Sequence, residues 1–292
     1  FQNILHRKQS ATGSNKQEDT INITLQFKNN NRSNVQLNSD TDFGRTANHF
    51  PEQYRIIYLS ADRLGPQIFL PTSWPKHCFP LVGERGEYVA ECLENFGDSL
   101  IPNALIHEAS QGSTLKFVTD SWLSEIAPGF PLTAKVFSEL SISSTSFNDT
   151  RPHNVGFGLS HALPVIIQTL AACCDTKGKT EGISNILALE NPEAHIHPKG
   201  QTQIGRFLAI AASTGTQIIV ETHSDYIIDG IRLAIKDKKL MCNDAIFHYF
   251  YLDKNHETQI TSIMSSEDGK LTSWPEGFFD QNLINKTELA GL

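Results

Sequence analysis

The sequence predicts an α/β fold with a mixed, largely parallel sheet, chiefly because strand and helix patterns alternate in its second half. Two short apolar runs, at 184–189 and 216–220, are typical of buried strands. Each is followed by a helical pattern, at 199–213 and 225–235. Strands that alternate with helices favour a parallel sheet covered by helices, and an apolar run at 245–252 is expected to add a third strand.

The composition fits a globular protein that builds a sizeable core. Of its 292 residues, 39% are apolar and 19% are charged, and the net charge is −8. The net negative charge argues against a protein that wraps nucleic acid over its whole surface, although it does not exclude a local basic patch. Apolar runs fall short of the roughly 18 residues of a membrane span. The five cysteines lack a CxxC pair, which favours reduced thiols, so we expect a cytoplasmic protein without a membrane partner.

Residues 1–65 predict the N-terminal β portion of the main domain. Residues 21–28 alternate apolar and polar side chains, and a second strand is expected near 35–37. A short apolar strand at 55–59 ends in the polar sequence SADR. The chain begins at Phe1 in a pattern typical of a helix interior, so we expect another segment to precede it.

Residues 66–150 predict an inserted helical arm or lid, because the pattern from about 85 to 145 is mainly helical. Residues 151–252 hold three polar motifs that follow or open regular elements. Residues 253–292 are rich in turns and aromatic side chains and predict a small C-terminal tail domain. Its aromatic residues either pack internally or form a docking surface for a partner.

The first motif is an apolar strand that ends in a carboxylate, Glu190, with a second carboxylate, Glu193, three residues later. Ligands of open α/β sheets bind beyond the carboxyl ends of the strands. There one carboxylate can hold Mg²⁺ through water, while its neighbour polarises an attacking water. The structural alternative is an acidic cap on the following helix.

Two further motifs also allow either a functional or a purely structural interpretation. The strand 218–220 leads into Glu-Thr-His-Ser-Asp, where His223 can contact and sense a γ-phosphate; alternatively, Ser224 or Asp225 only caps the next helix. Gly156, Gly158 and Ser160 open an apolar helix, whose N-terminal N–H groups suit an anion. The alternative there is a glycine-rich turn with Ser160 as the cap.

In this order the motifs resemble the C-terminal half of ABC-type ATPase heads, in the branch that includes OLD-like and SMC-like bacterial ATPases. The sequence GLS at 158–160 resembles the signature motif, ILALENPEAHIHP at 186–198 the Walker B strand, and IIVETHSD at 218–225 the switch-histidine loop. The segments YLSADRLGP at 58–66 and SWPEGFFDQ at 273–281 resemble bacterial AAA-family ATPases with a small C-terminal domain of unknown function. Many such ATPases occur beside nucleases or other effectors of antiviral defence.

The resemblance implies a P-loop-type ABC ATPase head that closes on ATP and Mg²⁺ as a homodimer. Glu190 would organise Mg²⁺ through water, and His223 would contact the γ-phosphate, with Glu193 as the other catalytic residue. The ATP-sandwich interface would place GLS against the partner subunit's ATP. The nucleotide contacts implied in this way are Arg63, Gly156, Gly158, Leu159, Ser160 and Asn191.

Two departures from the family pattern affect this interpretation. Asn191 stands where the family has a second acidic residue, and an amide cannot act as a general base. Either Glu193 takes that role or hydrolysis is slow. The sequence also lacks G-x-x-x-x-G-K-[ST]; the stretch nearest to it, at 13–16, does not fit, so we expect this loop upstream of Phe1.

The favoured function is therefore an ATPase that controls an effector protein, such as a nuclease, in bacterial antiviral defence, with DNA or RNA left open as partners. A non-hydrolysing nucleotide-dependent scaffold is the main alternative, supported by Asn191 and the missing loop. An OLD-family nuclease would need a further catalytic domain, for which the segment after His223 is too short. Metal binding by His195 and His197 is a weaker alternative to an ordinary loop.

Overall fold

The computed structural model describes residues 20–26, 32–38, 54–73, 77, 79–126, 128–174 and 184–291. The chain divides into two compact units. One comprises Phe1–Arg55 with His248–Ser262, and the other comprises Ile56–Phe247 with Ile263–Leu292. The second unit holds the motifs singled out above, and each unit is described by itself.

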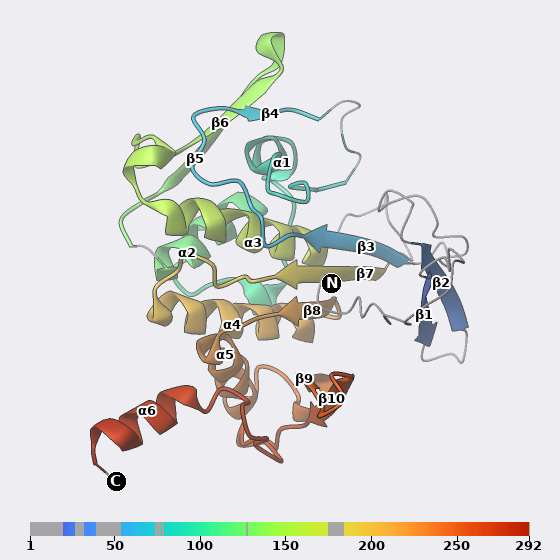
Figure 1. Cartoon of the computed structure of the whole chain (residues 1–292). Helices are drawn as coiled ribbons and strands as arrows, with labels where there is room; N and C mark the ends of the chain where they lie inside the picture. Colours follow the sequence, from blue (N-terminus) through green and yellow to red (C-terminus); the bar gives the residue numbers. More distant parts are fainter. Residues whose placement is uncertain are drawn as a thin grey trace. The chain divides into compact units, whose positions relative to one another are not determined.

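A parallel sheet forms the centre of the larger unit, as the sequence predicts. Its strands are β3 (Tyr54–Leu59), β7 (Ser184–Glu190) and β8 (Gln217–Glu221), in the order β3-β7-β8. Strands β7 and β8 pair in parallel, with Glu190 opposite Glu221 at their carboxyl ends. The arrows of all three strands point the same way in Figure 1.

Three helices predicted from the sequence connect and cover these strands. They are α3 (Phe157–Cys173), α4 (Pro198–Ser213) and α5 (Asp225–Lys236). Helix α3 is buried almost all round, which explains its continuous apolar sequence. Helix α5 begins at the Ser224 cap, whose hydroxyl accepts hydrogen bonds from Tyr226 N and Ile227 N. The prediction that Ser224 caps this helix is thus confirmed.

Residues 66–150 depart from the helical arm predicted for them. They contain α1 (Val89–Phe96) and α2 (Leu115–Ile126), but also an antiparallel sheet of three strands. Its strands, in the order β4-β6-β5, are β4 (Leu70–Pro71), β5 (Leu132–Phe137) and β6 (Ile142–Phe147). The helical prediction is therefore wrong over the β5–β6 hairpin. Strand β6 buries every second residue, a period of two that a helical interpretation overlooks.

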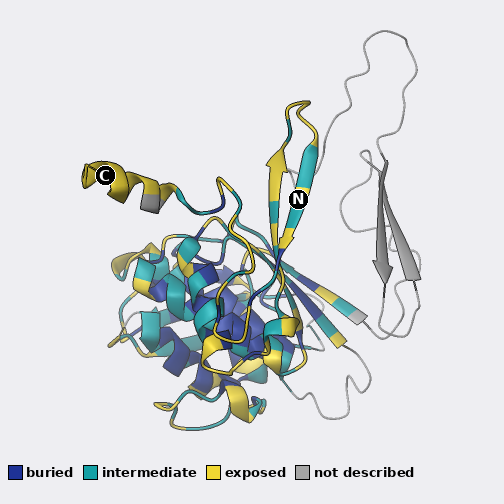
Figure 2. Cartoon of the chain, turned by 90° about the horizontal axis from the view of Figure 1, so that it is seen from below, coloured by how far each residue is buried: buried dark blue, intermediate teal, exposed yellow. Residues whose placement is uncertain are grey.

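One core joins the arm to the sheet. Figure 2 shows buried residues gathered within the helical layers. A single cluster of buried apolar side chains includes Val89, Leu115 and Phe147 of residues 66–150, together with Leu187 of β7 and Phe207 of α4. Residues 66–150 are therefore part of the folded body of this unit.

The strand expected at 245–252 exists as β9 (Phe247–Leu252), but its predicted place in the parallel sheet is wrong. It forms a separate two-stranded sheet with β10 (Thr258–Ile263). The third strand of the parallel sheet is instead β3, which comes from the start of the chain. The two predicted N-terminal strands are confirmed as the antiparallel pair β1 (Thr20–Gln26) and β2 (Arg32–Asn38).

The C-terminal segment packs on α5 before it ends in α6 (Gln281–Leu289). Arg232 Nε donates to the Gly269 carbonyl at 2.8 Å, and its guanidinium lies 5.6 Å from the centre of the Trp274 ring. Phe278 is buried, whereas Trp274 is about half exposed. Four short 3-10 helices complete the described structure: Asn103–Leu105, Ser138–Leu140, Pro152–Asn154 and Cys242–Asp244. Among the described helices, none has the length and apolar character needed to cross a bilayer.

Candidate nucleotide site at the carboxyl edge of the parallel sheet

The predicted polar residues of β7 and β8 meet at one edge of the sheet. Because the strands are parallel and Glu190 pairs with Glu221, the segments that follow β7 and β8 leave the sheet side by side. Glu193 lies three residues beyond the end of β7, and His223 two residues beyond the end of β8. This edge is where open α/β sheets bind ligands.

Glu190 is half-buried at the end of β7, and the loop after β3 fixes its carboxylate. Ala61 N donates to Glu190 Oε2 at 3.2 Å. The Tyr58 hydroxyl lies in the same surroundings; burial raises its pKa, its hydrogen bond to Ser60 lowers it, and Glu190 raises it further. The Glu190 carboxylate is thus oriented by β3 as well as by its own strand.

Arg63 connects the loop after β3 to the end of β7. Only 3% of the residue is exposed. Its Nη1 donates to the carbonyls of Ser60 at 3.0 Å and Glu190 at 2.7 Å, and its Nη2 donates to the Asn191 carbonyl at 2.6 Å. Burial lowers the pKa of Arg63 to about 10, while Glu193 and Glu190 act in the opposite direction. In this arrangement the guanidinium joins the loop after β3 to the end of β7. The assignment of Arg63 as a nucleotide contact stays a prediction.

Glu193 holds the loop that carries His223. Its Oε2 accepts a hydrogen bond from the Thr222 hydroxyl at 2.8 Å, and its Oε1 accepts one from His223 N at 2.9 Å. The residue is 9% exposed. Helix α4 begins at His197 without a side-chain cap, so Glu193 does not cap it. Each carboxylate oxygen therefore already fixes the backbone or side chain of the neighbouring loop.

His223 projects from the edge into solvent. Its side chain is 76% exposed, and its Nε2 lies 3.0 Å from Glu221 Oε1, whose side chain is 44% exposed. The imidazole is thus held by a carboxylate from the last residue of its own strand. Sequence reasoning missed Glu221, although the rule that selected Glu190, a carboxylate at the end of an apolar strand, applies equally to it.

Asn191 adopts a left-handed backbone with φ of 42° directly after β7. Asparagine enters this region more readily than most residues with a side chain, and glutamate has no such preference. Asn191 N donates to the Glu221 carbonyl at 2.9 Å and to Glu221 Oε2 at 3.3 Å. Asn191, which departs from the family pattern, thus forms the turn by which the chain leaves the sheet.

The glycine-rich motif packs against the loop that follows β7. Gly156 is the residue before α3 and has φ of 86°, a conformation that favours glycine. A Cβ atom on Gly158 would lie 2.8 Å from the His195 carbonyl oxygen, so only glycine lets the two segments approach this closely. The structure therefore brings the first turn of α3 beside the loop between Glu190 and α4.

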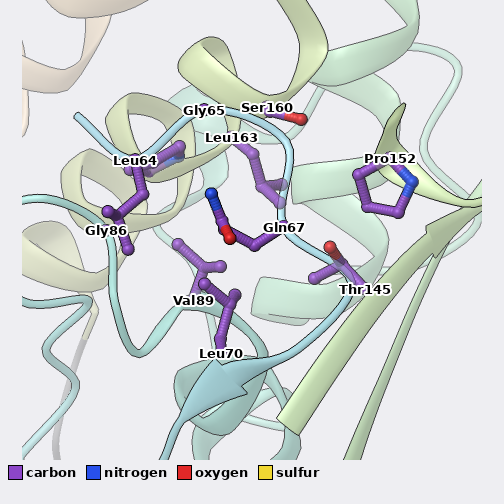
Figure 3. A pocket seen from close by; sticks show the side chains of 11 residues that line it. Leu64, Gly65, Gln67, Leu70, Gly86, Val89, Thr145, Pro152, Ser160 and Leu163 are labelled. Atoms are coloured by element: carbon purple, nitrogen blue, oxygen red, sulfur yellow. The ribbon is translucent and has the colours of Figure 1, made fainter. Parts of the chain in front are cut away.

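Ser160 lies inside α3 rather than at its cap, so the alternative that it caps the helix is wrong. Its hydroxyl is buried and has no hydrogen-bond partner among the described residues. It lines a pocket of about 20 Å³ together with Gly65, Gln67 and Leu163, which Figure 3 shows close by. That volume suits one water and is far too small for a nucleotide. Gly156 and Phe157, rather than Ser160, are the exposed residues at the start of the helix, while Leu159 is buried.

His161 of this helix and His195 of the neighbouring loop form a pair that the sequence patterns did not predict. The rings of His161 and His195 have centroids 4.4 Å apart, and Phe157 lies against both. Burial, with smaller contributions from His195 and Arg63, lowers the pKa of His161 to about 4. His161 is therefore neutral at physiological pH. His195, in the loop after β7, thus lies beside His161 of α3.

Glu190 suits Mg²⁺ by its chemistry, since the ion prefers carboxylate oxygens and retains several waters. Among the described residues there is no group of three histidine, cysteine or acidic side chains that could hold a metal by itself. One carboxylate, completed by phosphate oxygens and waters, is a common arrangement for Mg²⁺ with a nucleotide. The site therefore fits a cation that arrives with its substrate.

Comparisons with known proteins bear on the family of the chain. The family model described as "AAA ATPase domain" matches residues 1–228, and DUF3696, a protein domain of unknown function, matches residues 240–289. A comparison with curated proteins finds no match. A solved structure from work on "ATP-driven dimerization and DNA stimulated activation of SMC ATPases" aligns with 10% identity over 60% of this chain and 91% of that chain, with a TM-score of 0.36. At that score the alignment carries no functional argument.

Proposed function

Because the chain belongs to the AAA ATPase domain family over residues 1–228, we propose that it binds and hydrolyses ATP at the carboxyl edge of the β3-β7-β8 sheet. One observation carries this proposal: Glu190 and the loop bearing His223 leave adjacent parallel strands at the same edge. Glu193 joins the two loops through its hydrogen bonds to Thr222 and His223. Family membership supports the nucleotide, and this geometry supports the position of the chemistry.

Each residue has a distinct role in the proposed site. Mg²⁺, when bound, neutralises charge on the β- and γ-phosphates. Glu190 holds that ion through water from its fixed position at the end of β7. His223 turns its exposed imidazole toward the γ-phosphate, and Glu193 is a positioning residue that keeps the histidine loop in place. Asn191 supplies backbone geometry beside the phosphates.

We place the start of α3 at a dimer interface. Gly156 and Phe157 are exposed there, and the helix N-terminus offers N–H groups to an anion. Two heads that close in opposite orientation would each present the start of this turn, from Gly156 to Gly158, to the partner's ATP. The buried Leu159 side chain and Ser160 hydroxyl would stay within their own subunit. ATP then joins the subunits, and hydrolysis releases them.

The proposed cycle acts on a partner effector, such as a nuclease, in bacterial antiviral defence. What supports this is the resemblance of residues 58–66 and 273–281 to ATPases found beside such effectors, together with the match of residues 240–289 to DUF3696. The segment after β10 packs on α5, the helix that directly follows the histidine loop. Movement of that loop would therefore reach the C-terminal segment through a single helix.

The first experiment measures Mg²⁺-dependent ATP turnover by the native protein and its His223→Ala variant. We expect at least a tenfold loss of kcat, because the γ-phosphate loses a hydrogen-bond partner in the transition state. His256→Ala removes another exposed histidine from the β9–β10 turn and serves as the matched control. Equal turnover by all three proteins would contradict the placement of the site.

A non-hydrolysing scaffold is the second candidate, and the environment of two residues favours it. Asn191 cannot accept a proton from water, and both oxygens of the buried Glu193 are already hydrogen-bonded. This candidate predicts ATP-dependent dimers whose lifetime does not depend on Mg²⁺. Fluorescent-nucleotide binding and light scattering separate it from the leading proposal, which predicts dimers that dissociate as phosphate is released.

A further inference from the structure

Glu221 is an acidic residue at the sheet edge to which the proposed function assigns no role. It is the last residue of β8 and lies opposite Glu190 in the strand pairing. Its Oε1 is 3.0 Å from His223 Nε2, and its Oε2 accepts a hydrogen bond from Asn191 N at 3.3 Å. The carboxylate therefore lies between the residue that replaces the expected acid and the histidine expected at the γ-phosphate.

Glu193 and Glu190, the two glutamates discussed above, already have other roles at this edge. Glu193 is buried, and each of its oxygens accepts a hydrogen bond from the histidine loop. Glu190 takes the metal-organising role. Glu221 is different because its side chain is 44% exposed, so water reaches the carboxylate and its remaining lone pairs.

We propose that Glu221 is the general base of the reaction and replaces the acid that is missing at Asn191; this rests on the function proposed above. When His223 turns to the γ-phosphate, it releases Glu221 Oε1, which then accepts a hydrogen bond from the attacking water. The water oxygen forms a bond to the γ-phosphorus as its proton passes to Glu221. The bond from the γ-phosphorus to the bridging oxygen breaks, its electron pair leaves with ADP, and the proton later returns to solvent.

The structure already restrains this carboxylate for that role. The Asn191 amide keeps Oε2 in place through a backbone hydrogen bond, so Glu221 remains oriented after the histidine moves away. The backbone of the two strand ends is joined by a second bond, from Asn191 N to the Glu221 carbonyl at 2.9 Å. A general base held in this way contributes on the order of 10²–10⁴-fold to rate.

The test compares ATP turnover and ATP binding in the native protein, Glu221→Gln and Glu221→Asp. We expect Glu221→Gln to lower kcat at least 100-fold with little change in ATP affinity, because the amide keeps the shape but cannot accept a proton. Glu221→Asp retains a carboxylate and should keep more of the turnover. Glu267→Gln, an exposed acidic residue in the segment after β10, is the matched control.

A second readout separates a base from a structural residue. A base should be rescued by a shorter carboxylate, so Glu221→Asp should recover part of the kcat that Glu221→Gln loses, at equal ATP affinity. If kcat is undiminished in Glu221→Gln, or if its loss parallels a loss of ATP binding, the role of Glu221 as a base is wrong. The proposed ATPase function would still stand in that case, provided that the native protein hydrolyses ATP. Absence of turnover in the native protein would overturn both.

Discussion

At the residue scale, the site depends on side chains whose main partners are backbone atoms. Arg63 donates to three carbonyls from two loops, and Glu193 accepts from the backbone and side chain of a third. Such interactions fix loops that have little regular structure of their own. They also place a buried cation beside two carboxylates, so that Arg63 stays charged although burial lowers its pKa to about 10.

Replacing Arg63 should therefore destabilise the whole edge. Arg63→Met removes the donors of three carbonyls and leaves Glu190 and Glu193 without their buried counter-charge. We expect the free energy of unfolding to fall by roughly 3 kcal/mol, the usual range when one member of a buried charge network is deleted. Urea denaturation measures this. Arg85→Met is the control, because Arg85 forms an exposed ion pair with Asp62; an equal loss in both variants would refute the bracing role.

At the element scale, α4 and α5 approach each other closely through two glycines. A Cβ on Gly205 would lie 2.3 Å from the Ile227 carbonyl oxygen, and a Cβ on Gly230 would lie 2.3 Å from the Thr202 carbonyl oxygen. Both obstacles are backbone atoms of the facing helix, which cannot rotate away. Because α5 follows the histidine loop directly, this packing also fixes the direction in which that loop leaves the sheet.

We expect Gly230→Ala to separate these helices. Although alanine raises helix propensity by about 1 kcal/mol, the overlap with the Thr202 carbonyl should outweigh that gain and lower the free energy of unfolding by roughly 1–3 kcal/mol. Thermal unfolding followed by circular dichroism measures the change. Lys236→Ala, at the exposed end of the same helix, should leave the melting temperature nearly unchanged. A stabilised Gly230→Ala protein would show that the helices are not in this contact.

At the scale of the whole molecule, the proposed function draws on the sheet edge and on the exposed start of α3. The carboxyl edge provides Glu190, Glu221 and His223, while Phe157 and Gly156 at the start of α3 are exposed on the surface. The Ser160 hydroxyl lies in a small pocket within the same unit. An assembly of two heads would bring the exposed turn of one to the nucleotide of the other, in keeping with the proposed sandwich.

The proposed dimer should be sensitive to a change at the exposed Phe157. Phe157 is 58% exposed, so Phe157→Glu should leave the melting temperature almost unchanged. In the dimer, however, the new charge would face the partner's triphosphate, and we expect ATP-dependent association to weaken at least tenfold. Sedimentation with a slowly hydrolysed ATP analogue measures this. Phe250→Glu, about as exposed on β9, is the control; dimers of undiminished stability in Phe157→Glu would exclude this interface.

Local patterns determined much of the fold before any contact was known. The apolar run of β7 and the periodicity of α4 and α5 were sufficient, because the burial of a strand or of one helix face is visible in a short window. The run at 216–220 located β8, but the prediction that this strand is buried is wrong: none of the residues of β8 is buried, and Ile219 is 55% exposed. The same rule located Glu190 and the His223 loop at strand ends. It failed at the β5–β6 hairpin, where an alternating Ser/Thr-rich strand gives only a weak apolar signal.

The sequence by itself therefore determined the strands and helices of the motif-bearing half and placed Glu190 and the His223 loop at strand ends, but not the β5–β6 hairpin. Only the tertiary structure decided that β3 rather than β9 joins the parallel sheet, that Glu193 holds the histidine loop, and that Glu221 lies beside His223. The physical reason is the separation along the chain over which each effect acts. Propensity and periodicity act between neighbours in the chain, whereas strand order and a carboxylate's choice of partner depend on groups that only folding brings together.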